Sequence, residues 1–212
     1  MNFSTVILLH GFPSSGNSSK ARYFQERFEG VQRAEFHSFD FNPSPRDFEY
    51  LTITGMINRL RQYILDHNLT NVRIIGSSMG ALVGIHYSAW FGEVERMLLL
   101  APSLSYAEFE EEKRQDWEEE GIMQVVHFGF DLVLPLRYAM NVDGFQYQNP
   151  IAPSVPTMIV HGKRDDVVPI ESSRAYTAAY PQVVELVEVD SNHRLKDQMD
   201  KIWEYVVSFL LR

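Results

Sequence analysis

The stretch Gly76-Ser77-Ser78-Met79-Gly80 constrains the fold of this chain more than any other. It follows 72–75, a short β-branched run typical of a buried strand, and precedes an apolar segment that predicts a helix to about residue 91. A serine at the centre of a G-x-S-x-G turn between a strand and a helix is a nucleophile elbow, in which glycines allow the two elements to close up. The same residues would also fit a plain small-residue turn between packed elements, so the rest of the chain must decide.

Apolar, β-rich runs alternate with amphipathic segments along most of the 212 residues. This pattern predicts strands at 5–9, 34–41, 72–75, 94–100, 156–160 and 183–189, and helices from Ser18 or Ser19, at 51–66, at 170–180 and from Leu195. Such an alternation implies the α/β fold class, with a mainly parallel sheet and helices on both faces. We therefore expect a single domain over 1–212, interrupted by an insert at about 103–153.

The residues that follow the predicted strands are informative, because ligand sites of open α/β sheets lie beyond the carboxyl ends of the strands. One strand leads into His10-Gly11-Phe12, the elbow strand into Ser78, a later strand into Asp165 and the last strand into His193. Serine, acid and histidine follow one another in the chain order of an α/β-hydrolase triad. Four matches at strand ends make the elbow interpretation much stronger than the motif alone.

These motifs resemble the α/β-hydrolase superfamily, and in particular its compact bacterial esterases and thioesterases. The resemblance implies that Ser78 is the nucleophile, that His193 is the general base and that Asp165 orients the imidazole. It also implies an oxyanion hole made of the Phe12 and Met79 backbone N–H groups. The resemblance covers nearly the whole chain outside the insert and rests on His10-Gly11-Phe12, Gly76 to Gly80, Gly162 to Pro169 and Asn192-His193.

Several residues compete with these assignments. Ser77 is adjacent to Ser78 but lies off the centre of the motif, and Asp166 stands next to Asp165 as an alternative acid. His193 could be an ordinary loop histidine, although the upstream serine and acid favour catalysis. The remaining histidines are interpreted as structural, core or surface residues: His10, His37, His67, His86, His127 and His161.

The insert at about 103–153 lies where the resembling family places a cap over its site. It contains an acidic stretch, 108–120, that predicts a helix, followed by alternating apolar residues that predict a small hairpin: Val126, Phe128, Phe130, Leu132, Leu134 and Leu136. Phe128 and Phe130 are our candidate substrate-binding residues, as part of an acyl pocket. The alternative is that this row of side chains packs the insert onto the body.

The amino-acid composition limits the kinds of partner and of cofactor that we expect for this chain. The net charge of −9 argues against nucleic acid or an anionic membrane as a partner, since both are polyanions. The chain has no cysteine and no apolar run of membrane-spanning length, and its N-terminus has no basic region typical of a signal peptide, so a cytoplasmic location is expected. The acidic stretch offers no clear metal-ligand set, and a serine mechanism needs no cofactor.

The leading hypothesis is a serine hydrolase that cleaves small carboxylic esters or thioesters through an acyl-enzyme. One alternative keeps the fold and triad but changes the reaction to that of a C–C bond hydrolase, a peptidase or a lyase. Another is a non-catalytic ligand-binding protein of the same fold, since fold does not fix function.

Overall fold

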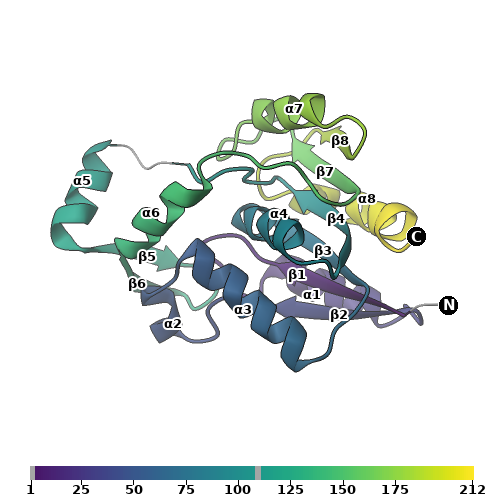
Figure 1. Cartoon of the computed structure of the whole chain (residues 1–212), viewed down its shortest axis with the longest axis horizontal. Coiled ribbons are helices and arrows are strands. Elements are labelled where there is room, and N and C mark those ends of the chain that lie inside the picture. Colours follow the sequence, from purple (N-terminus) through teal and green to yellow (C-terminus); the bar gives the residue numbers. More distant parts are fainter. Residues whose placement is uncertain (1–2, 108–110) are drawn as a thin grey trace.

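A six-stranded sheet forms the centre of the computed structural model, which describes residues 3–107 and 111–212 (Figure 1). The first part of the predicted acidic helix, 108–110, lies outside the described residues. The strand order is β2-β1-β3-β4-β7-β8, and every pairing in this sheet is parallel. The strands are β1 (Ser4–Leu9), β2 (Ala34–Phe39), β3 (Val72–Ser77), β4 (Val94–Leu100), β7 (Thr157–Gly162) and β8 (Val184–Val189). The predicted α/β fold class is confirmed.

The strand order reverses between β1 and β3, since β2 lies on one side of β1 and the later strands continue on the other. At such a switch point the connections leaving the two neighbouring strands diverge to opposite faces, which opens a crevice at their carboxyl ends. The loop beginning at His10 leaves β1, and the elbow leaves β3. The topology therefore brings together two of the segments that the sequence predicts for the site.

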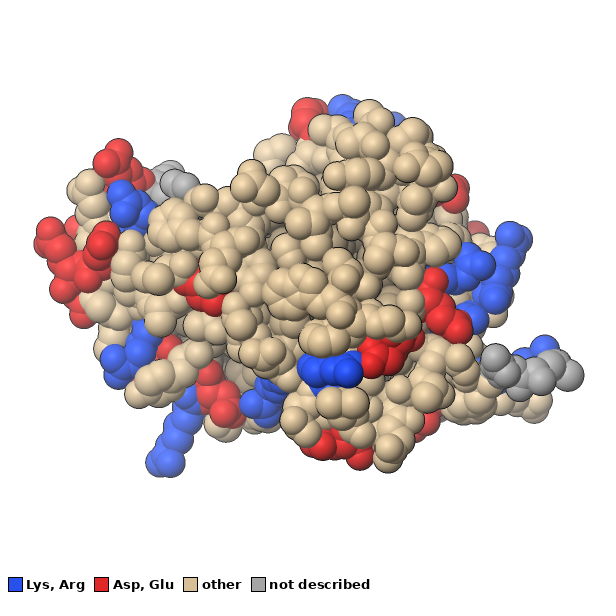
Figure 2. Space-filling model, in the orientation of Figure 1, with Lys and Arg blue, Asp and Glu red and all other residues tan. Residues whose placement is uncertain are grey.

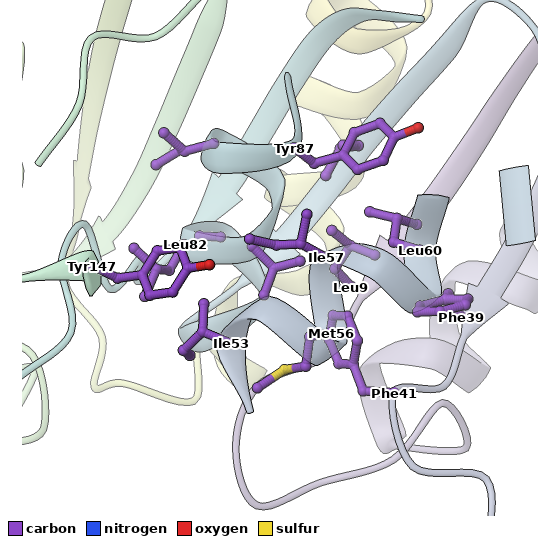
Figure 3. Packing of buried hydrophobic residues seen from close by; sticks show 14 of the residues in the cluster. Leu9, Phe39, Phe41, Ile53, Met56, Ile57, Leu60, Leu82, Tyr87 and Tyr147 are labelled. Carbon is purple, nitrogen blue, oxygen red and sulfur yellow. The ribbon is translucent and has the colours of Figure 1, made fainter. Parts of the chain in front are cut away.

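Helices cover both faces of the sheet. The helices α3 (Ile53–Asp66), α4 (Met79–Trp90) and α7 (Ile170–Ala179) contribute to one apolar cluster, and α1 (Ser19–Phe28), α8 (Met199–Tyr205) and the π-helix η3 (Val206–Leu210) contribute to the other. Alternate residues of β1 supply both clusters: Ile7 and Leu9 face the first, whereas Val6 and Leu8 face the second. Figure 3 shows part of the first cluster, in which side chains from α3 meet those of β1 and α4.

A short helix, α2 (Pro45–Glu49), occupies a segment for which the sequence analysis predicted no element. Pro45 stands at the start of the helix, a position where its fixed φ is favourable and its missing N–H costs nothing. Ser44 and Asp47 form a capping box, with the Ser44 amide donating to the Asp47 carboxylate at 2.9 Å. Pro45 and the capping box therefore fix the start of this helix.

The insert between β4 and β7 lies beyond the carboxyl ends of the sheet strands (Figure 1). It holds α5 (Glu111–Glu120), the antiparallel strands β5 (Ile122–His127) and β6 (Leu132–Arg137), α6 (Ala139–Gly144) and the 3-10 helix η1 (Phe145–Tyr147). A second 3-10 helix, η2 (Lys196–Gln198), precedes α8. Figure 2 shows acidic side chains gathered at the end of the molecule that α5 forms. None of the described helices has the length and apolar character needed to cross a bilayer.

The hairpin exists, but the expected single apolar face is wrong. Residues 128–131 form its turn, and this turn breaks the alternation between the two strands. Leu134 and Leu136 of β6 are buried, whereas Val126 of β5 and Leu132 are exposed. The buried face of β5 instead carries the side chain of His127. Counting in steps of two through a turn therefore assigned Val126 to the wrong face.

Candidate active site

The turn after β3 holds Ser78 in a conformation that is rare for a residue with a side chain. Its φ is +51° and its ψ is −120°, and α4 begins at the next residue. A Cβ at Gly80 would lie 2.2 Å from the Leu9 carbonyl oxygen, and one at Gly76 would lie 2.7 Å from Cα of Ala81. Both glycines are required because backbone atoms occupy the space. The elbow therefore places the Ser78 side chain beyond the end of β3 as the motif predicts.

Ser78, His193 and Asp165 come together in the structure although they are far apart in the sequence. The Ser78 Oγ lies 3.2 Å from His193 Nε2, and His193 Nδ1 lies 2.8 Å from Asp165 Oδ2. The Asp165 side chain is fully buried, whereas that of His193 keeps 19% of its surface exposed. These two contacts link a hydroxyl to an imidazole and the imidazole to a carboxylate, which is the arrangement of a nucleophile, a base and an orienting acid.

The environment of Asp165 keeps its carboxyl group ionised. Its Oδ1 accepts hydrogen bonds from the Val167 and Val168 amides at 2.9 and 2.8 Å. Burial alone would raise the pKa of Asp165, but these amides and His193 outweigh it and hold that pKa below its ordinary value. The neighbouring Asp166 is exposed. Of the two adjacent acids, the structure turns Asp165 toward His193.

The loop after β1 packs against the elbow. A Cβ at Gly11 would lie 3.1 Å from Cβ of Ser78, so the loop approaches the serine as closely as a glycine permits. His10 holds this loop, because its Nδ1–H donates to the Gly11 carbonyl at 2.8 Å while its Nε2 lies 3.3 Å from Asp40. His10 thus has the structural role that the sequence analysis gave it.

The amides of Phe12 and Met79 are the two groups that the sequence analysis proposed for an oxyanion hole. Met79 is the first residue of α4, where helix amides point outward without helical partners. Within the described part of the chain, no hydrogen bond uses the amide of either residue. Both residues line the two hollows next to the elbow, and their role as an oxyanion hole stays a prediction.

Two hollows flank these amides. The larger has about 450 Å³ of space, part of it open to solvent, and the smaller about 190 Å³. The larger is lined by Phe12, Met79, Leu82, Ser103, Ser105, Tyr106, Ala107, Leu136 and Met140. The smaller is lined by His10, Gly11, Phe12, Ser14, Phe41, Asn42, Leu51, Met56 and Met79. The described lining of both hollows contains no lysine, arginine, aspartate or glutamate.

The insert reaches the larger hollow with residues other than the two candidates, Phe128 and Phe130. Phe128 is 67% exposed, and Phe130 stacks on His127 with 4.5 Å between the ring centroids; neither is among the described residues that line these two hollows. Leu136 and Met140 line it instead. Leu136 belonged to the predicted apolar row, but α6, which carries Met140, left no clear pattern in the sequence.

Ser77 takes a different direction from its neighbour. Its Oγ accepts a hydrogen bond at 3.0 Å from Nζ of Lys20, a residue of α1. Burial, with Lys196 and Arg194 nearby, lowers the pKa of Lys20 to about 8, and Asp165 opposes this shift. Sequence reasoning had no signal for this lysine. No group of three or more described histidines, aspartates or glutamates is arranged to hold a metal ion.

Comparisons with known proteins agree with this architecture. A family model described as "Uncharacterised protein family (UPF0227)" matches residues 5–210. The 2-hydroxy-6-oxo-6-(2'-aminophenyl)hexa-2,4-dienoic acid hydrolase of Metapseudomonas resinovorans is 26% identical, over 95% of this chain and 75% of that protein. The mouse α/β-hydrolase domain-containing protein 10 superposes with a TM-score of 0.75 at 17% identity, covering 96% of this chain and 88% of that one. An esterase from Exiguobacterium antarcticum gives 0.74 at 17% identity, covering 100% and 93%. The resemblance to α/β-hydrolases is confirmed at the level of the fold.

Proposed function

The chain belongs to the uncharacterised protein family UPF0227 and has the α/β-hydrolase fold, and from this premise we propose that it is a hydrolase that cleaves small carboxylic esters or thioesters through an acyl-enzyme. The observation that carries the proposal is the continuous chain of contacts from Ser78 Oγ through the His193 ring to Asp165. The esterase among its structural neighbours adds support by analogy.

The first half-reaction forms the acyl-enzyme. Ser78 Oγ attacks the substrate carbonyl carbon, and His193 Nε2 takes the hydroxyl proton. The carbonyl oxygen becomes negatively charged and accepts hydrogen bonds from the Phe12 and Met79 amides. The tetrahedral intermediate then collapses, the bond to the alcohol or thiol breaks, and His193 returns the proton to that leaving group.

The second half-reaction releases the acid. Water gives a proton to His193 and attacks the acyl carbon, and the bond to Ser78 Oγ breaks as the serine regains its proton. Asp165 stays ionised throughout and stabilises the imidazolium that forms twice per cycle. Its lowered pKa supports this role.

The insert serves as a cap over the acyl site in this proposal. Leu136 and Met140 of the insert line the larger hollow together with Phe12 and Met79. The uncharged described lining of both hollows favours an uncharged acyl group.

We place this protein in the cytoplasm, in agreement with its composition.

C–C bond hydrolysis is the second candidate, because the relative from Metapseudomonas resinovorans is named as the hydrolase of a keto acid whose name contains no ester or thioester. A substrate carboxylate needs a cationic partner, and the described lining offers none. We therefore rank this reaction below ester hydrolysis.

A panel of chromogenic esters and acyl thioesters, together with a vinylogous keto acid, tests the proposal. We expect turnover of uncharged esters or thioesters by the wild-type protein and by Ser77→Ala, and none by Ser78→Ala. Circular dichroism of each variant controls for folding. Turnover of the keto acid alone would replace the ester assignment, and turnover by Ser78→Ala would overturn the mechanism.

A further inference from the structure

We propose that His161 is a positioning residue that acts on the base His193 through the carboxylate of Asp165. This inference rests on the proposed function, because it assigns a task to a residue behind the same triad. His161 lies in β7, four residues before Asp165, and its side chain is fully buried. From the sequence, His161 is expected to be structural; its contacts indicate a further role.

The hydrogen-bond partners of His161 fix where its proton lies. Its Nε2 is 3.1 Å from Asp165 Oδ2 and 3.0 Å from the Val168 carbonyl oxygen, and both of these atoms accept only. The Nε2 atom must therefore carry a proton. The other ring nitrogen, Nδ1, lies 2.7 Å from the hydroxyl of Ser173, a buried residue of α7 that can donate to it. One proton on Nε2 and one from Ser173 satisfy both ring nitrogens.

The two histidines share one carboxylate oxygen. Asp165 Oδ2 accepts from His193 Nδ1–H at 2.8 Å and from His161 Nε2–H at 3.1 Å, while two backbone amides hold Oδ1. Four donors thus fix the plane of the carboxylate. Because His161 also binds the Val168 carbonyl, it ties the turn after Asp165 to β7.

This sharing has a chemical consequence beyond orientation. A hydrogen bond from His161 draws negative charge on Oδ2 toward a second donor, so the carboxylate stabilises the His193 imidazolium less than it would alone. Without His161, the Asp165 carboxylate would interact more strongly with the His193 imidazolium. Other charged groups around the pair stay in place in such a variant, namely Lys20 of α1, Glu188 of β8, and Lys163, Arg194 and Lys196 of the neighbouring loops.

Packing alone does not require a histidine at this position. A leucine would fill a similar volume between β7 and α7 and would bring no polar atom that must be satisfied. The chain offers a matched comparison in His86 of α4, which is also buried but whose Nε2 has no hydrogen-bond partner in the described structure. His86→Leu therefore controls for the loss of a buried imidazole as such.

The test compares His161→Leu, His161→Gln and His86→Leu by kcat and KM on one activated ester over a pH series. We expect His161→Leu to lower kcat roughly 10- to 100-fold, as loss of an outer-shell partner does at metal sites, with KM nearly unchanged. The acid limb of kcat/KM should move to higher pH. Gln places an amide nitrogen as many bonds from the backbone as His Nε2, so His161→Gln should recover most of the rate. His86→Leu should leave rate and pH profile unchanged.

A second measurement separates this inference from the proposed function. The low-field proton resonance of His193 Nδ1–H, recorded without substrate, should move in His161→Leu because Asp165 becomes a stronger acceptor. An unmoved resonance, or an unmoved acid limb with a lower melting temperature only, would return His161 to a packing role. If the resonance moves but the wild-type protein hydrolyses no ester, the proposed function fails while the positioning role stands. Should His161→Leu not fold, Ser173→Ala tests the same relay: a smaller rate loss supports it, and an unchanged profile overturns it.

Discussion

Adjacent residues with the same side chain have different environments at this site. Ser77 and Ser78 are neighbours, yet one accepts from Lys20 and the other contacts His193. The left-handed φ of Ser78 separates them, because it turns the chain sharply between strand and helix. Asp165 and Asp166 differ in the same manner, with one buried against His193 and the other exposed.

The two acids give a matched pair of variants. Asp165→Asn should keep the shape of the side chain but misdirect the imidazole tautomer, which costs on the order of 10⁴ in turnover in serine proteases. Asp166→Asn, changed at an exposed position, should cost at most a few fold. Turnover of both purified variants on one activated ester decides, with circular dichroism as the folding control. If Asp166→Asn were inactive and Asp165→Asn active, the orienting acid would be Asp166 and our assignment would be wrong.

Because Lys20 is buried, we expect the stability of the folded protein to depend on pH. Its pKa is about 8 in the folded protein and about 10.5 when unperturbed, so burial of its charge destabilises the fold. Below pH 8 both states are protonated and the full cost is present; between pH 8 and 10.5 the folded state gives up its proton first, and the cost disappears. At about 1.4 kcal/mol per pKa unit, Lys20→Met should stabilise the protein by roughly 1–3 kcal/mol at pH 7, the lost bond to Ser77 offsetting part of the gain.

Denaturant unfolding at several pH values measures this effect. The gain of Lys20→Met should shrink steadily as the pH rises from 8 to 10.5. The exposed Lys163 supplies the control, since Lys163→Met should change stability little at any pH. A loss of stability in Lys20→Met at pH 7, or a gain that does not depend on pH, would contradict the account of the buried charge.

At the scale of elements, the hairpin shows where a periodic pattern stops being informative. The strands were predictable from their apolar residues, but the turn at 128–131 changed which face is buried. Period-two counting holds within one strand and not across a turn. The short helices α2 and α6 were missed, because five or six residues are too few to reveal a helical period.

From the residues that line the larger hollow we predict how a substitution changes substrate preference. Met140→Ala removes a wall of the larger hollow and should shift preference toward bulkier acyl groups, at a stability cost of about 2–5 kcal/mol for a buried methionine. Phe128→Ala, at a 67% exposed position, should change neither preference nor stability by much. Rates on esters of increasing acyl length, with melting temperatures, check both. A shift caused by Phe128→Ala alone would restore the original pocket assignment.

For the whole molecule, the sequence predicted the sheet and much of the candidate site for one physical reason. Parallel strands end on the same edge, so residues that follow strands meet there whatever their separation in sequence. This rule brings Ser78 to Asp165 and His193, and it applies equally to Ser103 and Tyr106 after β4, which the sequence analysis overlooked. The rule could not predict contacts such as those of Lys20 and His161, because they depend on how side chains of separate elements pack.

The central claim is that Ser78 is a nucleophile activated by His193, and the site of covalent labelling tests it most directly. The protein is incubated with a fluorophosphonate, digested, and its peptides are analysed by mass spectrometry. We predict one phosphonyl adduct, on Ser78, absent from Ser78→Ala, retained in Ser77→Ala, and formed at least about 10³-fold more slowly in His193→Ala. An adduct on Ser77 or on any other residue, or labelling of His193→Ala at the wild-type rate, would contradict the account.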